Sequence, residues 1–435
     1  MSLILDLLGA GWAGLLDYLA AHVLLCLVPA FFIAGYLSGL MPKEIVTRYL
    51  GPKTPKYVSY PAAAIGGFVL AVCSCTILPL FAGIWKRGAG LGPAVTFLFV
   101  GPAVNILAIS YTGSAIGMDI AIARIVLAIT FGIAIGLIMA AIFKQPAADP
   151  AKAALFDQTA TLRPALSALF ALLIAVLIAG TLQIGLLKNA VFSVTLPLAL
   201  SDGVQDALDA LDLTLQGALL IALLVVIAPV AWKGLNNVLS GFNRWTWAAL
   251  GLVAVTLLLA APTTDSSSIV INFTGRFFAE IALLGGIVYV VTKHVTHDEL
   301  ASWLWETWRF VKQIFPLLII GVFVAGMFRE ITPEEWVQQL AGRNTIWANL
   351  IGVTFGVFMY FPTLVEVPVA AAFLDLGMHR GPLLAYLLAD PELSLQSILV
   401  TSRIMGRSKT ATYVSLVALF STVAGYLFGA ALAAF

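Results

Sequence analysis

The stretch Val72–Pro79, VCSCTILP, carries two thiols inside a segment apolar enough to lie in a bilayer. On an intact helix, residues two positions apart point to nearly opposite sides, so Cys73 and Cys75 could not act together. On an unwound backbone they face the same way. Pro79 favours unwinding, because it has no N–H and its ring clashes with the carbonyl group of Cys75. The stretch therefore predicts an unwound tip at membrane depth, which survives only where protein or a cavity covers it.

Composition places the chain among polytopic membrane proteins. Of its 435 residues, 61% are hydrophobic and 10% are charged, and the mean hydropathy is +1.02. A net charge of +1 gives no basic field for nucleic acid. The four His are too scattered for a His-built metal site, and three Cys make no disulfide framework. The N-terminus shows no basic region or cleavage site, so we expect no cleaved signal peptide. No cofactor and no enzymatic activity are expected.

About 20 consecutive apolar residues are needed to span a bilayer, and ten stretches meet that requirement. They are residues 18–40, 93–111, 120–143, 165–187, 215–232, 246–262, 277–292, 309–328, 382–400 and 411–433. Two further apolar stretches, 57–86 and 346–375, are interrupted midway by proline and polar residues, and a charged, glycine-containing turn follows each. We predict that both are re-entrant hairpins. The expected fold is an all-α membrane protein with about ten full spans.

The placement of charge gives an orientation. If both hairpins return to the side from which they enter, the basic residues between spans fall on one side. They are Lys43, Arg48, Lys53, Lys56, Lys86, Arg87, Lys144, Lys152, Arg163, Lys233, Arg244, Lys293, Arg309, Arg403, Arg407 and Lys409. The opposite side collects acids, namely Asp202, Asp206, Asp209, Asp212, Glu330, Glu334 and Glu335. By the positive-inside rule, both termini are extracytoplasmic in the inner (cytoplasmic) membrane.

An internal repeat relates the two hairpins. At a constant offset of 289, residues 67–102 align with 356–391, and the shared positions are helix breakers. The aligned pairs are Gly67 with Gly356, Pro79 with Pro368, Gly88 with Gly377, Gly92 and Pro93 with Gly381 and Pro382, and Pro102 with Pro391. The predicted orientation makes this repeat inverted, an arrangement that places substrate sites near the midplane. We predict a first repeat at 1–143, connecting helices at 144–308 and a second, inverted repeat at 309–435.

The two copies differ in chemistry. The first supplies the candidate substrate-binding residues Cys73, Ser74, Cys75, Thr76 and Asn105, and the second supplies Thr363 and Glu366. Intramembrane carboxyl groups are functional by default, and burial favours their protonated form, which suits proton transfer. The candidate proton-coupling residues are Glu366, Asp390 and Glu392, and the candidate helix breaks are Pro79, Pro102, Pro362, Pro368 and Pro391.

Each of these residues also has a purely structural interpretation. Cys26 lies on an apolar helical face and is expected to be a packing residue. The prolines could be simple kinks, which transmembrane helices tolerate. Glu366 could be the structural partner of an arginine, and Asp390 and Glu392 could lie at the membrane interface if the predicted span is misplaced.

The chain resembles the predicted permease family that includes the methylarsenite efflux permeases (ArsP- and YraQ-type). The resemblance rests on CSCTILPLFAGIWKRGAGLGPAVTFLFVGPAVNI at 73–106 and YFPTLVEVPVAAAFLDLGMHRGPLLAYLLADPELSL at 360–395. It implies a permease with Cys73 and Cys75 near the transport path and a soft metal or metalloid ion as cargo. The chain has no third membrane cysteine close to this pair, which puts a site of three thiolates in question.

Three functions fit these observations. The first is a proton-coupled efflux permease for a soft metal, a metalloid or an organometalloid or thiol species. The second is a transmembrane thiol–disulfide redox protein that uses Cys73 and Cys75, although cysteines so close in sequence form a strained ring. The third is a small-anion transporter or channel that uses helix N-termini. No Walker-type loop is present, so ATP is not expected to be the energy source. The expected partners are the lipid bilayer, the small substrate and protons; the oligomeric state, a homo-oligomer included, stays open.

Overall fold

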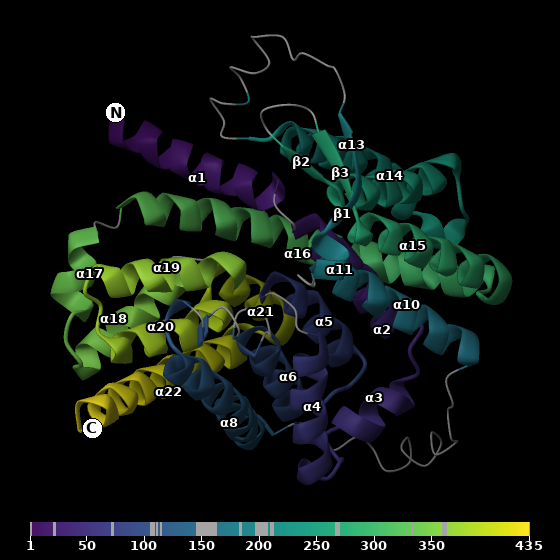
Figure 1. Cartoon of the computed structure of the whole chain (residues 1–435). Helices are drawn as coiled ribbons and strands as arrows, with labels where there is room; N and C mark the ends of the chain where they lie inside the picture. The colour runs from purple at the N-terminus through teal and green to yellow at the C-terminus, as the bar shows by residue number, and fades with distance from the viewer. Residues whose placement is uncertain are drawn as a thin grey trace. The chain divides into compact units, whose positions relative to one another are not determined.

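A computed structural model gives the fold of most of the chain (Figure 1). It describes residues 2–20, 23–70, 74–104, 109, 112–113, 115–144, 163–181, 185–195, 208, 213–265, 270–331, 334–358 and 363–434. These residues are almost entirely helical, as the long apolar runs require in a medium where every backbone polar group must be satisfied internally. They group into two compact units, each of which combines distant parts of the sequence.

The smaller unit comprises Trp12–Met41 and Thr161–Gln313. Its helices are α2 (Val23–Gly39), α10 (Pro164–Thr181), α11 (Gly185–Lys188), α13 (Leu215–Leu235), the 3-10 turn η1 (Val238–Ser240), α14 (Arg244–Ala260) and α15 (Gly275–His294). Two of these helices have side-chain N-caps. The Thr214 side chain accepts a hydrogen bond from the Gly217 N–H at the start of α13, and Asn243 forms a capping box at the start of α14. Apolar side chains from α13, α14 and α16 (His297–Ile331) form a buried cluster in this unit, and α10 packs on α2 and α15.

A three-stranded antiparallel sheet in the smaller unit departs from the all-α prediction. It consists of β1 (Ala190–Thr195), β2 (Thr263–Asp265) and β3 (Val270–Thr274), in the order β1-β3-β2. The segments AVFSVT and VINFT are rich in the β-branched and aromatic residues that favour strands. Phe192 of β1 stacks on its strand partner Phe273 with ring centroids 4.7 Å apart.

The larger unit comprises Met1–Gly11, Pro42–Ala160 and Ile314–Phe435, so that α1 (Ser2–Ala20) and α16 are divided between the units. Its other helices are α3 (Lys43–Leu50), α4 (Lys56–Leu70), α5 (Ser74–Lys86), α6 (Leu91–Ala103), α8 (Met118–Ile142), α17 (Glu334–Ala341), α18 (Ile346–Phe358), α19 (Thr363–Asp375), α20 (Arg380–Leu393), α21 (Leu395–Met405) and α22 (Arg407–Ala434). In Figure 1, α18, α20 and α22 lie side by side.

Two sets of helices in this unit correspond at the offset of 289. The helices α19, α20 and α22 each begin 289 residues after α5, α6 and α8, respectively. Packing follows the same order: α4 packs on α6 and α6 on α8, as α18 packs on α20 and α20 on α22. Phe131 of α8 and Phe420 of α22, which are equivalent positions, meet edge to face with centroids 5.0 Å apart.

The turns ahead of these helices correspond as well. Gly88 and Gly377 have φ of +95° and +93°, and Gly117 and Gly406 have φ of +145° and +90°. Only glycine adopts such backbone conformations without steric strain, which explains why these positions share glycine while the surrounding sequence differs.

The predicted helix breaks lie differently from the expectation. Pro79 and Pro368 are the sixth residues of the continuous helices α5 and α19, so the unwinding predicted at Pro79 is wrong and Cys75 is helical. A helix tolerates an internal proline at the loss of one backbone bond, and Pro79 therefore has no N–H to donate to the Cys75 carbonyl. Pro102 and Pro391 lie in the last turns of α6 and α20. Pro362 lies outside the described residues.

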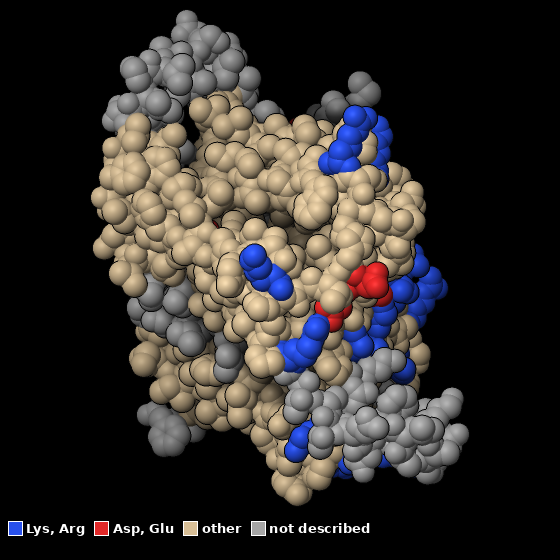
Figure 2. Space-filling model, turned by 90° about the vertical axis from the view of Figure 1, so that its right-hand side faces the viewer, with Lys and Arg blue, Asp and Glu red and all other residues tan. Residues whose placement is uncertain are grey.

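Among the described residues, six helices are long and apolar enough to cross a membrane: α8, α10, α13, α15, α16 and α22. The pair α20 and α21 adds a seventh if its two helices, which meet at a 45° bend, form one span. On the face that Figure 2 shows, most of the described surface is uncharged, and Lys and Arg side chains appear only in separate small groups. These features are those of a polytopic membrane protein; the count of ten spans stays a prediction.

Candidate functional site

The most conspicuous polar contact in the larger unit is an ion pair between α8 and α19. Arg124 and Glu366 are 0% and 1% exposed. One guanidinium nitrogen, Arg124 Nη2, lies 2.9 Å from Oε1 and 3.0 Å from Oε2 of Glu366. Water does not solvate a guanidinium at a buried position, so a buried arginine requires an anionic partner. The pair joins two residues that are 242 positions apart in the sequence.

Two further polar residues, both on α20, interact with the Arg124–Glu366 pair. Asp390 is 1% exposed and Tyr386 is fully buried. Asp390 interacts electrostatically with both Glu366 and Arg124, and so does Tyr386. The absence of a side chain at Gly356 lets α18 approach here, since a Cβ atom there would lie 2.9 Å from the Asp390 backbone nitrogen.

A second buried hydrogen bond lies between α20 and α22. The Tyr413 hydroxyl donates to Oε2 of Glu392 over 2.7 Å, and both residues are buried. Glu392 also interacts electrostatically with Arg124 and Glu366. Tyr413 occupies the position in α22 that corresponds to Arg124 in α8, so the same helix position supplies a donor to a carboxyl group in both halves.

Several polar atoms of this group have no hydrogen-bond partner among the described residues. They are Nε and Nη1 of Arg124, both carboxyl oxygens of Asp390, Oε1 of Glu392 and the hydroxyl of Tyr386. Buried polar atoms are normally paired. Arg124, Glu366, Tyr386, Asp390 and Glu392, which we call the buried charged centre, therefore retain capacity to bind protons, water or a polar ligand.

The predicted acidic residues Glu366, Asp390 and Glu392 are thus all buried, and Asp390 and Glu392 both interact electrostatically with Glu366 and Arg124. Thr76 is buried on α5. Ser74 and Cys75 begin α5 and Thr363 begins α19, but their side chains are outside the described part of the structure. Cys73 and Asn105 also fall outside it. Among the residues that the structure describes, no group of three or more His, Cys, Asp or Glu could hold a metal ion.

Sequence reasoning missed Arg124, Tyr386 and Tyr413. Arg124 could have been noticed as an ionisable residue five positions into the predicted span 120–143, where a charge indicates function. The two tyrosines carry no such signal, since buried tyrosine is common in apolar helices.

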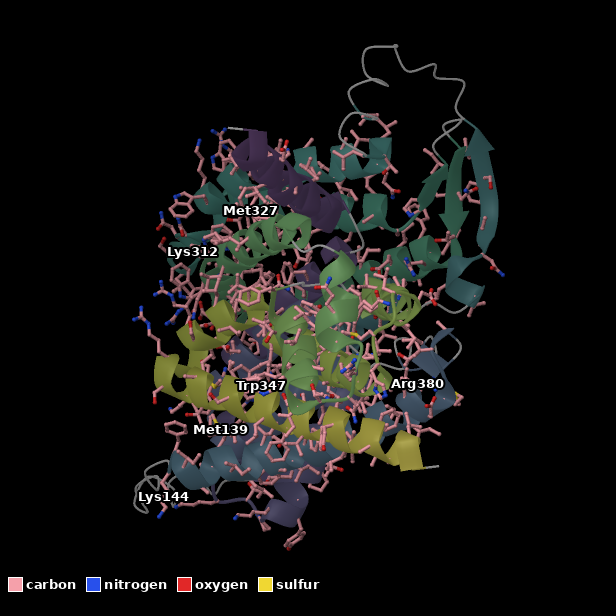
Figure 3. All side chains as sticks on the ribbon, turned by 90° about the vertical axis from the view of Figure 1, so that its left-hand side faces the viewer. Met139, Lys144, Lys312, Met327, Trp347 and Arg380 are labelled. Atoms are coloured by element: carbon pink, nitrogen blue, oxygen red, sulfur yellow. The ribbon has the colours of Figure 1, made fainter. Side chains whose placement is uncertain are left out.

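A second ion pair joins the first turn of α8 to the first residue of α20. Arg380, labelled in Figure 3, lies 3.3 Å from Asp119 and donates to the Ile116 carbonyl over 2.9 Å. Both ionic side chains are 37% exposed. Asp119 precedes Arg124 by five residues, or about 7.5 Å along the helix. Buried apolar side chains, including Ile120, Leu383 and Leu387, belong to the core cluster that packs here.

Comparison with known proteins finds a matching family model and a similar full-length protein. A family model described as a predicted permease, ArsP_1, matches residues 10–158 and 285–430. The UPF0718 protein MJ0584 of Methanocaldococcus jannaschii is 36% identical over 432 residues, which cover 99% of this chain and 98% of that protein. No solved structure matches. All residues of the buried charged centre lie within the ranges that the family model matches.

Proposed function

The chain belongs to the ArsP_1 predicted permease family, and we propose that it is a proton-coupled secondary transporter whose coupling residues form the buried charged centre. Membership of this family, together with the long apolar helices, supports a multi-pass membrane transporter. The coupling ion, the substrate and the direction of transport are the parts that we propose.

The observation that carries the proposal is an excess of acid over base in the buried charged centre. It contains one guanidinium and three carboxyl groups, those of Glu366, Asp390 and Glu392. Desolvating an ion costs several kcal/mol unless a counter-ion offsets it, and Arg124 offsets one carboxylate. The other two are stable only as protonated acids or beside a bound cation. Such a centre exchanges a proton for a cationic ligand when that ligand enters or leaves.

The proposed cargo is a soft metal, a metalloid or an organometalloid or thiol species. Support comes from the CSCT segment of this sequence, in which Cys73 and Cys75 offer the sulfur ligands that such species prefer. Ser74, Thr76, Asn105 and Thr363 are the proposed polar residues beside them. The start of α5 at Ser74 and of α19 at Thr363 gives the two segments equivalent places in the fold.

We further propose that 1–143 and 309–435 form an inverted repeat with two re-entrant hairpins, joined by 144–308. The corresponding helix starts, packing order and positive-φ glycines support the repeat. Its inversion rests on the distribution of basic residues, from which we also propose that both termini lie on the extracytoplasmic side of the membrane. In this arrangement the Arg124–Glu366 pair links the two repeats, as the coupling site of such a transporter should.

The Asp119–Arg380 pair is the proposed gate on the extracytoplasmic side. Arg380 begins α20, and Tyr386 and Asp390 follow about 9 and 15 Å along that helix. When this ion pair is formed, it and the apolar residues packed beside it would separate the buried charged centre from the extracytoplasmic medium. Breaking the pair would open a path between the two. Half-exposed ion pairs contribute little net stability, so they can open and close readily.

The experiment that tests the function is a metal and metalloid panel in cells with and without the gene. We expect expression to lower the accumulation of a soft species such as methylarsenite, and Cys73→Ser to abolish that effect at equal protein abundance. Accumulation that does not depend on expression for any soft metal or metalloid would reject this substrate class.

A further inference from the structure

The smaller unit carries a group of cationic and indole side chains that the transport mechanism does not use. Lys312 of α16, labelled in Figure 3, has its ammonium group 4.9 Å from the ring centroid of Trp305, 5.7 Å from that of Trp308 and 5.8 Å from that of Trp232. Asn236 Oδ1 accepts hydrogen bonds from both Lys312 Nζ and Trp308 Nε1, each over 2.8 Å. Lys312 is therefore held in one position before any ligand arrives.

Two more cations extend this group at the ends of α13 and α14. Lys233 and Arg244 lie over the Trp245 ring, 5.0 and 5.5 Å from its centroid. Trp232 and Trp308 meet edge to face at 6.2 Å and connect the two parts. We call the set the basic–aromatic cluster; its members are Trp232, Lys233, Asn236, Arg244, Trp245, Trp305, Trp308 and Lys312.

The cluster has an excess of positive charge. Within the described part of the chain, Lys233, Arg244 and Lys312 form no ion pair with a carboxylate. Glu306, the nearest acid along α16, accepts a hydrogen bond from Ser38 and lies 3.9 Å from Arg309. Trp232 is 59% exposed, so the cluster opens to the surface. Its three cations therefore have no carboxylate partner among the described residues, and the position of Lys312 is already fixed by Asn236 and the indole rings.

The location of the cluster indicates the source of that anion. It lies where α13 ends and α14 begins, and directly ahead of the apolar run of α16 that starts after Gln313. Indole rings prefer the level of the lipid headgroups, and basic residues between helices at this level bind anionic headgroups. We infer that the basic–aromatic cluster is a binding site for the headgroup of an anionic phospholipid, with Lys312 as its central phosphate ligand.

Native mass spectrometry of the full-length protein tests this inference independently of transport. The titrants are phosphatidylglycerol and phosphatidylcholine with the same acyl chains. We expect tighter binding of phosphatidylglycerol, and Lys312→Gln should weaken it about fivefold, the effect of about 1 kcal/mol for one basic residue at a membrane surface. Phosphatidylcholine binding should not change. Lys312→Arg should retain most of the preference, and Lys293→Gln, which removes a charge elsewhere, should retain all of it.

Equal phosphatidylglycerol binding by the wild type and Lys312→Gln would overturn the inference, as would equal binding of the two lipids by the wild type. Displacement of phosphatidylglycerol by millimolar inorganic phosphate would assign the site to free phosphate instead. If Lys312→Gln fails to fold, the exposed pair Lys233→Gln and Arg244→Gln replaces it. Removal of these two charges should weaken phosphatidylglycerol binding about 30-fold, and unchanged binding would overturn the inference.

Discussion

The buried charge of Arg124 determines which other charged groups are favourable around it. An arginine within a bilayer-length helix is costly to bury, and here its charge is offset by one carboxylate that contacts it through both oxygens. Asp390 and Glu392, with no second arginine among the described contacts, leave the centre more acidic than it is basic. The centre's protonation state therefore depends on what else is bound.

The first prediction concerns this pair. Arg124→Gln and Glu366→Gln should each destabilise the protein by about 3–5 kcal/mol, because each leaves one buried charge without its partner. The double variant, which leaves neither charge, should recover most of that loss. Thermal unfolding in detergent measures this, with Arg163→Gln, in the half-exposed Arg163–Glu299 pair, as the control with little effect. Additive losses in the double variant would contradict the coupling.

A second prediction concerns the thiols. Cys73→Ser and Cys75→Ser should each abolish transport of a soft species while leaving the folded fraction unchanged, because serine conserves size but not sulfur ligation. Cys26→Ser is the matched control and should transport normally. Normal transport by both single variants of the pair would show that these sulfurs only pack, and would remove the redox interpretation as well.

At the scale of elements, sequence reasoning could locate most helices of the larger unit and their glycine turns. Breaker residues recur at a fixed offset because backbone geometry demands them, so they remain visible where side chains have diverged. The continuous course of α5 through Pro79 could not be predicted, since an internal proline is compatible with either a break or a tolerated kink. Neighbouring helices decide between these outcomes, and the sequence does not show them.

The same limit applies to the site. The three carboxyl groups could be found as charges in apolar segments, whereas the partner of Glu366 could not. Arg124 and Glu366 are 242 residues apart, and the packing that brings α8 to α19 is set by the whole unit. The small sheet was missed for a similar reason: its strands are short, and β3 pairs both with its neighbour β2 and with β1, which lies about 75 residues earlier in the sequence.

Close helix approach at corresponding positions supports a third prediction. A Cβ atom at Gly136 would lie 2.6 Å from the Gly92 carbonyl oxygen, and one at Gly425 would lie 2.5 Å from that of Gly381. Gly136→Ala and Gly425→Ala should each destabilise the protein by about 1–3 kcal/mol through overpacking. Gly251→Ala, which meets nothing within 4 Å in a helix, should be neutral or stabilising. Thermal unfolding that ranks all three alike would contradict this packing.

At the scale of the whole molecule, the two compact units do not follow chain order. The smaller unit takes Trp12–Met41 together with Thr161–Gln313. Hydropathy identifies candidate spans one at a time and carries no information on which of them pack together, so this grouping could not be predicted. The proposed division at 143 and 308 describes the repeat in the sequence, not these units.

The fourth prediction is the membrane orientation. If the repeat is inverted, cysteines introduced at Lys86 and Asp375 should react with an impermeant thiol reagent from opposite sides, and those at Asp119 and Arg380 from the same side as Asp375. Labelling in intact and in permeabilised cells distinguishes the sides. Labelling of positions 86 and 375 from one side would rule out the inversion.

The central claim is that the buried charged centre couples protons to substrate movement, and flux into proteoliposomes against an imposed pH gradient tests it most directly. The probe is methylarsenite, and Glu366→Gln is tested alone and combined with Arg124→Gln. The affinity of these variants for methylarsenite should stay within about an order of magnitude of that of the wild type. Their gradient-driven flux should be lost, because a carboxamide cannot carry the proton. Glu392→Gln should show a milder loss, and Glu299→Gln, a surface control, none. Undiminished gradient-driven flux in Glu366→Gln would contradict the account.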